Sequence, residues 1–369
     1  MNISIIITFY NGINILKTCL EKIIETLPQQ GSRIVYEILI VNDNPSISLN
    51  DIVKYYTGLL NIRIINMDEN RGYSAACNIG VANAQYENIL LLDCDIMPHG
   101  KWLYNMIQSY KAINYKGSVS ATIINMTTNT LFSFGVCIYG VDIILIKRNG
   151  KMSEYTTTDR DYPIVTSGCL LMPKKLYISL GGQEEMMINA YNDFDVTYKI
   201  FKMGYSNRVC SSAIVYHRGS VSGKIRHLPF KSDAKALMFQ RWGKELQEPT
   251  EKILEEIYQS YHGVNNSNII VLNFSNSVCS DFYINKFCEV HNLIILQQQR
   301  YKNIEMDNII LNDYLSLEVC RTNIPMLYFV DDYTLLSSNY YWFLNRTNNQ
   351  DVILDVNANA LDIKDILKN

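Results

Sequence analysis

Two aspartates, Asp93 and Asp95, are the residues of this chain best suited to chemistry, and only Cys94 separates them. They follow the apolar run 88–92, which is typical of a buried strand in a mostly parallel sheet. Open α/β sheets bind ligands at the carboxyl ends of their strands, where these carboxylates would lie. Hard oxygen donors at this spacing suit a divalent cation that carries a diphosphate, Mg²⁺ or Mn²⁺. The same pattern also fits two solvated acids in a turn. The elements around the two aspartates are therefore needed to choose between a cation site and a turn.

The elements around these aspartates alternate between strands and helices. Strands are predicted over residues 3–8, 37–41, 62–66 and 89–92, and helices over 13–26 and 74–84. This alternation predicts a parallel sheet with right-handed crossovers. After about residue 115 the pattern becomes rich in strands, predicted over 118–125, 130–136, 141–147, 168–172 and 209–216. A helix over 193–203 would have Asn192 as its N-cap and end at Gly204.

The character of the chain changes near residue 244. A charged helical stretch and a polar segment lead into a second alternating region, with strands predicted near 269–274, 293–297, 326–330 and 352–356. We therefore expect an α/β domain over residues 1–245, a helical linker over 246–267 and a small α/β accessory domain over 268–369. The accessory domain could recognise an acceptor or form a homo-oligomer.

Composition excludes several classes of protein. A net charge of −3 argues against a nucleic-acid partner, and no apolar stretch reaches the length of about 20 residues that crosses a bilayer. Nine cysteines without paired metal spacing favour reduced thiols. The amino terminus shows no signal peptide, so we expect a cytoplasmic protein. Because 26 tyrosines could sit at an interface, peripheral contact with the inner face of the membrane stays open.

Several short motifs occur in a fixed order over residues 1–245. They are Thr8-Phe9-Tyr10-Asn11, Val41-Asn42-Asp43, the block Asn70-Arg71-Gly72-Tyr73-Ser74-Ala75-Ala76-Cys77-Asn78-Ile79-Gly80, Asp93-Cys94-Asp95, Gly168-Cys-Leu-Leu, Gly181-Gly182-Gln-Glu-Glu185, Asn192-Asp193-Phe194-Asp195 and Val215-Tyr216-His217. Together they resemble the family 2 glycosyltransferases. That resemblance implies the GT-A fold, a Rossmann-like mixed sheet, and a UDP-, GDP- or dTDP-linked sugar donor.

The resemblance also implies roles for individual residues. Thr8, Phe9, Tyr10, Asp43, Arg71, Gly72, Asn78, Asp93 and Cys94 would bind the nucleotide sugar, with Asp43 on the base. Asp95 would be the main metal ligand, assisted by Asp93 and by His217, whose imidazole favours Mn²⁺ over Mg²⁺. Asp193 would be the catalytic base. Glu184, Glu185 and Asn192 would lie on the acceptor side, and Lys224, Arg226 or His227 would help from a lid over residues 218–224 and beyond.

Two departures from the family pattern qualify this interpretation. Asn192 stands where the family usually has a glutamate, so a non-catalytic protein that binds nucleotide sugars or glycans is an alternative. Gln240-Arg241-Trp242 lacks the spacing of processive synthases, so we expect one sugar per encounter. A sugar-phosphate nucleotidyltransferase is a further alternative, but it would need a glycine-rich basic loop after the first strand. The acceptor could be a glycan, a lipid-linked saccharide or a protein, and a surface polysaccharide or glycoconjugate is the expected product.

Overall fold

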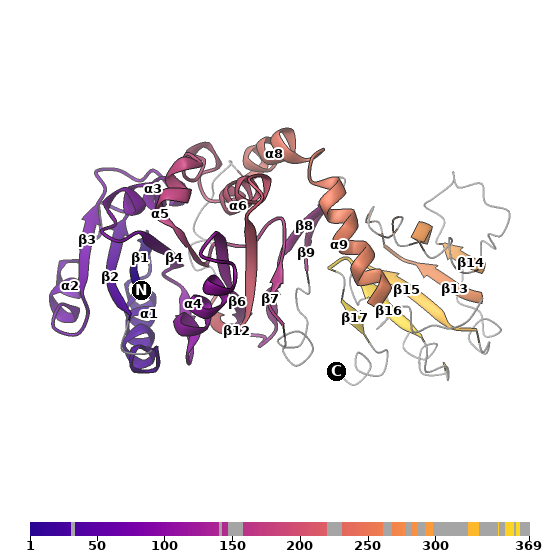
Figure 1. Cartoon of the computed structure of the whole chain (residues 1–369), viewed down its shortest axis with the longest axis horizontal. Helices are drawn as coiled ribbons and strands as arrows, with labels where there is room; N and C mark the ends of the chain where they lie inside the picture. Colours follow the sequence, from indigo (N-terminus) through magenta and orange to yellow (C-terminus); the bar gives the residue numbers. More distant parts are fainter. Residues whose placement is uncertain are drawn as a thin grey trace. The chain divides into compact units, whose positions relative to one another are not determined.

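The computed structural model describes residues 1–30, 34–139, 142–146, 158–219, 231–260, 268–275, 277, 280, 282, 284–286, 292–297, 324–331, 346, 351–357 and 359–361 (Figure 1). The chain separates into two compact units. One comprises Met1–Cys137 and Lys147–Gly243, and the other comprises Ile138–Ile146 and Lys244–Asn369. The two units are described separately below.

The first unit is built on a ten-stranded mixed sheet. Eight of its strands follow the order β10-β12-β6-β11-β4-β1-β2-β3, and the other two, β5 and β7, pair with β12 and β6, respectively. Its strands are β1 (Asn2–Phe9), β2 (Val35–Asn42), β3 (Ile62–Asn66), β4 (Asn88–Asp93), β5 (Ile96–Pro98), β6 (Gly117–Asn125), β7 (Leu131–Ser133), β10 (Arg160–Asp161), β11 (Cys169–Pro173) and β12 (Ser206–His217). The run β4-β1-β2-β3 is parallel as predicted, whereas β11 runs antiparallel to both β4 and β6.

Helices pack around this sheet (Figure 1). They are α1 (Ile13–Thr26), α2 (Asn50–Tyr56), α3 (Tyr73–Asn83), α4 (Trp102–Ala112), α5 (Lys174–Ser179), α6 (Asn192–Lys202) and α8 (Lys231–Trp242), with short 3₁₀ turns η1 (Leu27–Gln29) and η3 (Glu185–Met187). The central strands are apolar along nearly their whole length because both faces of the sheet are covered. Gly80 lets α3 approach β1 closely, since a Cβ there would lie 2.4 Å from Ile6 Cγ2.

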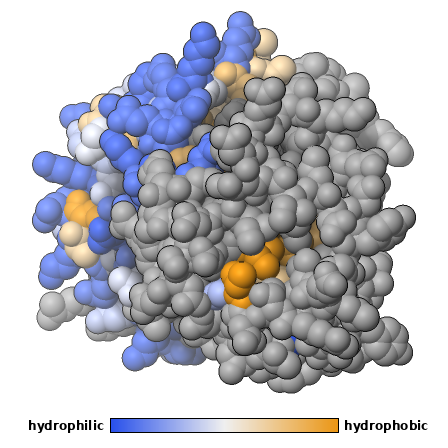
Figure 2. Space-filling model, turned by 90° about the vertical axis from the view of Figure 1, so that its right-hand side faces the viewer, coloured by the Kyte–Doolittle hydropathy of each residue, from blue (hydrophilic) through white to orange (hydrophobic). Residues whose placement is uncertain are grey.

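The second unit contains a five-stranded sheet with the order β14-β13-β15-β16-β17. Its strands are β13 (Asn268–Asn273), β14 (Asn292–Gln297), β15 (Met326–Val330), β16 (Val352–Asp355) and β17 (Ala360–Leu361), all parallel except β17. The helix α9 (Gln247–Ser260) and most of the hairpin β8 (Val136–Tyr139) and β9 (Asp142–Leu145) belong to it as well. In this unit, the Ile138 amide donates to Thr250 Oγ1 at 3.1 Å. The coloured residues in Figure 2 are mainly hydrophilic, with apolar groups in small patches.

Most predicted elements are present, with differences at their ends. The segment predicted as one strand over 130–136 is divided between β7 and β8, because Gly135 (φ 113°) lies between them with Tyr162 packed against it. The predicted N-cap of α6 is wrong by one residue, since Tyr191 (φ 61°) precedes a helix that begins at Asn192. Gly204 (φ 76°) follows the end of that helix as expected. The predicted lid lies outside the described residues from position 220 to 230.

No helix within the described ranges is long and apolar enough to cross a membrane.

Candidate functional site

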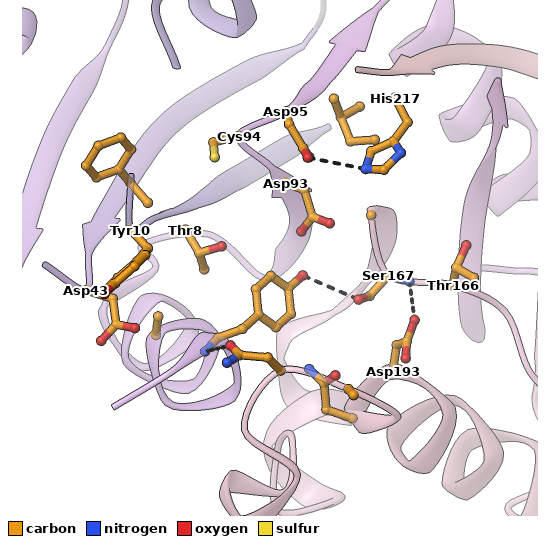
Figure 3. Close-up of a pocket in the computed structure, with 18 of the residues that line it drawn as sticks. Thr8, Tyr10, Asp43, Asp93, Cys94, Asp95, Thr166, Ser167, Asp193 and His217 are labelled. Atoms are coloured by element: carbon orange, nitrogen blue, oxygen red, sulfur yellow. Dashed lines mark hydrogen bonds and ion pairs between the residues drawn. The ribbon is translucent and has the colours of Figure 1, made fainter. Parts of the chain in front are cut away.

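A cavity of about 310 Å³ opens at the carboxyl ends of β1, β2 and β4 (Figure 3). The predicted site residues that line it are Thr8, Phe9, Tyr10, Asp43, Asp93, Cys94, Asp95, Asn192, Asp193 and His217. They come from segments far apart in the sequence, which the parallel strand order brings to one edge of the sheet. Figure 3 shows Asp43 and Asp193 on opposite sides, with Asp93 between them.

Asp43 follows β2, is almost fully buried and lines this cavity. One carboxylate oxygen accepts the Arg71 amide at 2.7 Å and the other accepts the Gly72 amide at 2.9 Å. Asp43 therefore also holds the loop that precedes α3. A carboxylate has about four lone-pair sites, so it can accept hydrogen bonds from several donors at once.

Arg71 and Asn78 lie outside the cavity lining. The Arg71 guanidinium is largely exposed and pairs with Glu185 at 2.8 Å. Asn78 accepts the Tyr177 hydroxyl at 2.7 Å and donates to the Gln183 carbonyl at 2.9 Å. Asn78 thus ties α3 to the segment that carries the acidic residues before α6, and the contacts of both residues support this loop.

Asp95 and His217 are brought together by strand pairing. β5 runs antiparallel to β12 with His217 opposite Ile96, the residue after Asp95. His217 Nε2 lies 3.3 Å from Asp95 Oδ2, and both side chains are mostly buried. Burial disfavours the charged imidazole, but the hydrogen bond to Asp95 and the charges of Asp95 and Asp93 together outweigh it and raise the pKa of His217 above its ordinary value.

Asp93 ends β4 and lies deeper in the site. Burial, followed by the neighbouring Asp95 charge, raises the pKa of Asp93 to about 6. Its Oδ1 atom is buried and accepts no hydrogen bond from the described part of the chain. An orphaned carboxylate oxygen inside a polar cavity is costly unless a further group, such as a cation or a water, satisfies it.

The residues at this edge fit a divalent cation of the Mn²⁺ type. Two carboxylates and an imidazole are suitable donors, and Asp93 has a free oxygen facing no protein partner among the described residues. However, within the described ranges no three acidic, histidine or cysteine side chains are grouped so that they alone could hold a metal ion. A cation held here would need further ligands, and Mg²⁺-like ions usually take these from substrate phosphates.

Asp193 faces the cavity from the first turn of α6. The Ser167 amide donates to its Oδ2 at 3.2 Å, and the Phe194 amide donates to its Oδ1 at 3.0 Å. Burial raises the pKa of Asp193 to about 6, against these stabilising hydrogen bonds. A carboxyl group that changes protonation near neutral pH is well suited to accept a proton.

Asp195, two residues further along α6, points elsewhere. It is fully buried and binds Lys199 at 2.6 Å and the Trp242 indole N–H at 2.8 Å. Arg241 lies 3.5 Å from it and also pairs with Glu184 at 2.6 Å. This network attaches α8 to α6, so Asp195 has a structural role.

Glu184 and Glu185 lie outside the cavity lining, in ion pairs with Arg241 and Arg71. Asn192 does line the cavity, but its Nδ2 donates to Gln183 Oε1 at 2.8 Å. The side chains of Glu184, Glu185 and Asn192, which were predicted to lie on the acceptor side, are therefore bound by other residues of the protein.

Tyr73 and Ser167 are among the cavity residues that the sequence prediction did not assign to the site. Tyr73 lies inside a motif block that was identified, and Ser167 directly precedes the Gly168 motif. Neither carries a charge, so only their position in the structure draws attention to them. Their hydroxyl oxygens are 3.3 Å apart.

Comparison with known proteins connects this site to a family. Residues 4–181 match the family model "Glycosyl transferase family 2". The chain is 32% identical over 109 residues to hyaluronan synthase of Pasteurella multocida, covering 29% of this chain and 11% of that protein. It is 32% identical over 110 residues to chondroitin synthase of Escherichia coli, covering 29% of this chain and 15% of that protein. The chain thus spans only a small part of these relatives.

The fold itself is shared with a solved structure. A crystal structure of GalNAc-T7 with UDP, GalNAc and Mn²⁺ superposes with a TM-score of 0.53 at 14% identity, covering 72% of this chain and 52% of that chain. This similarity and the mixed sheet confirm the expected GT-A fold. Residues 4–181 are therefore similar to the family 2 glycosyltransferases, in agreement with the motifs found in the sequence.

Proposed function

We propose that this chain is an inverting, non-processive glycosyltransferase that moves one sugar from a nucleoside-diphosphate donor to an acceptor. The observation that carries the proposal is the single cavity lined by Asp43, the pair Asp93 and Asp95, and Asp193. Across the site, Asp43 would bind the base and a cation on Asp93 and Asp95 would bind the diphosphate. Asp193 would face the acceptor hydroxyl (Figure 3).

Asp95, Asp93 and His217 would hold a divalent cation, Mn²⁺ in preference to Mg²⁺ because of the imidazole. When bound, such a cation neutralises the charge that builds on the departing diphosphate. The buried Asp93 oxygen without a partner in the described chain supports this assignment. So does the fold shared with GalNAc-T7, which was crystallised with UDP and Mn²⁺.

Asp193 would act as the general base. The acceptor oxygen attacks the anomeric carbon, the bond from that carbon to the diphosphate breaks, and the acceptor proton passes to the Asp193 carboxylate. Because attack comes from the face opposite the leaving group, the configuration inverts. The hydrogen bond from the Ser167 amide orients this carboxylate, and its raised pKa supports proton transfer near neutral pH.

The relatives guide the choice of substrates. Hyaluronan synthase and chondroitin synthase are polysaccharide synthases, so we favour a glycan acceptor in polysaccharide or glycoconjugate synthesis. We favour a UDP-linked sugar because GalNAc-T7, which shares the fold, was crystallised with UDP. Lipid-linked saccharides and protein side chains are the other acceptor classes to test. The domain division we propose is a transferase domain over residues 1–245, a linker over 246–267 and an accessory domain over 268–369.

A donor screen tests this function. The full chain is incubated with Mn²⁺ and with UDP-, GDP- or dTDP-linked sugars, and release of the nucleotide diphosphate is measured with and without glycan acceptors. We expect one nucleotide class to be turned over, with loss of turnover on chelation and in Asp193→Asn. Donor binding without turnover would favour a non-catalytic binding protein, and absence of both would refute the proposal.

A further inference from the structure

Tyr73 occupies a central place in the site that the roles above do not use. It is the first residue of α3, its side chain is half-buried, and its ring lines the cavity. The same cavity is lined by Asp43, Asp93 and Asp193.

The backbone around Tyr73 is held from several directions. The Tyr73 amide donates to Asn189 Oδ1 at 2.9 Å, and the Ser74 amide donates to the Ile188 carbonyl at 3.0 Å. The preceding Gly72 adopts φ 88°, and a Cβ there would lie 2.6 Å from Ile188 Cγ2. These contacts fix the backbone from which the ring projects.

The Tyr73 hydroxyl connects two segments of the site. It lies 3.3 Å from Ser167 Oγ, and it also lowers the pKa of the neighbouring Asp93 carboxyl group, as a hydrogen-bond donor to that group does. Asp93 needs this donor, because its buried Oδ1 already accepts no hydrogen bond within the described ranges. The Asp93 amide in turn donates to the Gly168 carbonyl at 3.0 Å, which ties the end of β4 to the same segment.

Ser167 carries the connection to the other carboxylate. Its amide donates to Asp193 Oδ2 at 3.2 Å, and its side chain is almost fully buried. A shift of Ser167 would therefore move the hydrogen bond that orients Asp193. One tyrosine hydroxyl thus touches both the carboxylate proposed to face the cation and the segment that holds the proposed base.

We propose that Tyr73 is a positioning residue of the transfer reaction, which orients Asp93 directly and Asp193 through Ser167. This inference rests on the proposed function, since it concerns the same site. Tyr73 does not exchange protons with the substrate in this scheme. It acts by keeping two carboxylates in the geometry that transfer requires, and misplacement by about 1 Å can cost on the order of 100-fold in rate.

The test compares Tyr73→Phe, Ser167→Ala and the double variant with the wild-type chain, using the donor found in the screen. Tyr55→Phe is the matched control, because that tyrosine is 71% exposed on α2. We expect kcat of Tyr73→Phe to fall about 10- to 100-fold, while the donor KM and the Kd for UDP change less than about threefold. The double variant should lose no more than about twofold beyond Tyr73→Phe, because both changes break one connection.

The outcomes separate this inference from the proposed function. Wild-type kcat in Tyr73→Phe, or a change confined to KM and UDP affinity, overturns the positioning role while the transferase function stands. Losses in the single variants that multiply in the double variant also overturn it. If Tyr73→Phe fails to fold in a thermal melt, Ser167→Ala with an unchanged melting temperature decides in its place. A wild-type chain that turns over no donor removes the proposed function and this inference with it.

Discussion

Asp193→Asn gives the sharpest test of the site. The variant side chain has nearly the same shape as the carboxyl group, and its oxygen can still accept one of the two amides that now bind Asp193, from Ser167 and Phe194. It cannot accept a proton from the acceptor hydroxyl. We expect transfer to fall by about 10²- to 10⁴-fold, with the Kd for the nucleotide sugar nearly unchanged.

The raised pKa of Asp193 also predicts an effect on stability. In the folded protein the pKa is about 6, against an ordinary value of 3.8. The folded state therefore holds the proton more tightly, and this contribution is fully present below pH 3.8 and is lost as the pH rises through 6. A difference of roughly two pKa units corresponds to about 3 kcal/mol, an upper limit because the side chain faces an open cavity.

The amide of the variant does not ionise, so this pH-dependent loss should disappear. At pH 4 the two proteins carry neutral groups at this position, and their free energies of unfolding should agree within about 1 kcal/mol. At pH 7 the variant should be the more stable by up to about 3 kcal/mol. Urea unfolding at intervals from pH 4 to pH 7.5 measures the difference. A difference that stays constant over this range refutes the assignment of a buried, high-pKa carboxyl group, and wild-type transfer refutes its role as the base.

Three further predictions follow from the same geometry. Asp95→Ala should weaken binding of UDP in the presence of Mn²⁺ by at least about tenfold in calorimetry, and an unchanged affinity would remove Asp95 from the cation site. Gly72→Ala should lower the free energy of unfolding by about 2–4 kcal/mol, because a Cβ at φ 88° meets Ile188 Cγ2 at 2.6 Å; stability within 0.5 kcal/mol (about the error of such measurements) would contradict the packing. Asp195→Ala should cost about 3 kcal/mol and shift Trp242 fluorescence, because the buried partner of the indole N–H is lost; an unchanged spectrum would show that α8 does not depend on this network.

Local sequence was sufficient for most elements of the transferase domain. The apolar runs that became β1 and β4 have few polar interruptions, since each of these strands is covered on both faces. α1 was predicted at the bounds that the structure has, because its apolar residues recur at helical spacing and Pro28 lies just after it. The segment 130–136 was predicted less well, because a positive φ at Gly135 depends on the packing of Tyr162.

The sequence by itself indicated which residues are candidates for chemistry. Asp93 and Asp95 were proposed from their spacing after an apolar strand, and Asp193, at the start of a predicted helix, from the resemblance to the family 2 glycosyltransferases. Those signals are local, because strand ends and helix starts impose a direction on the side chains that follow them. The opposite directions of Asp193 and Asp195 on α6 follow from the same helical geometry.

Tertiary structure alone decided how these groups are paired. His217 reaches Asp95 through the pairing of β5 with β12, which joins residues more than a hundred positions apart. Arg71 turns to Glu185 instead of lining the cavity, and the uncharged Tyr73 bridges Asp93 and Ser167. Such contacts depend on sheet register and on loops from distant segments, and neither leaves a periodic mark in the local sequence. The chemical groups can therefore be predicted from their types and spacing, whereas their partners are set by the packing of the whole fold.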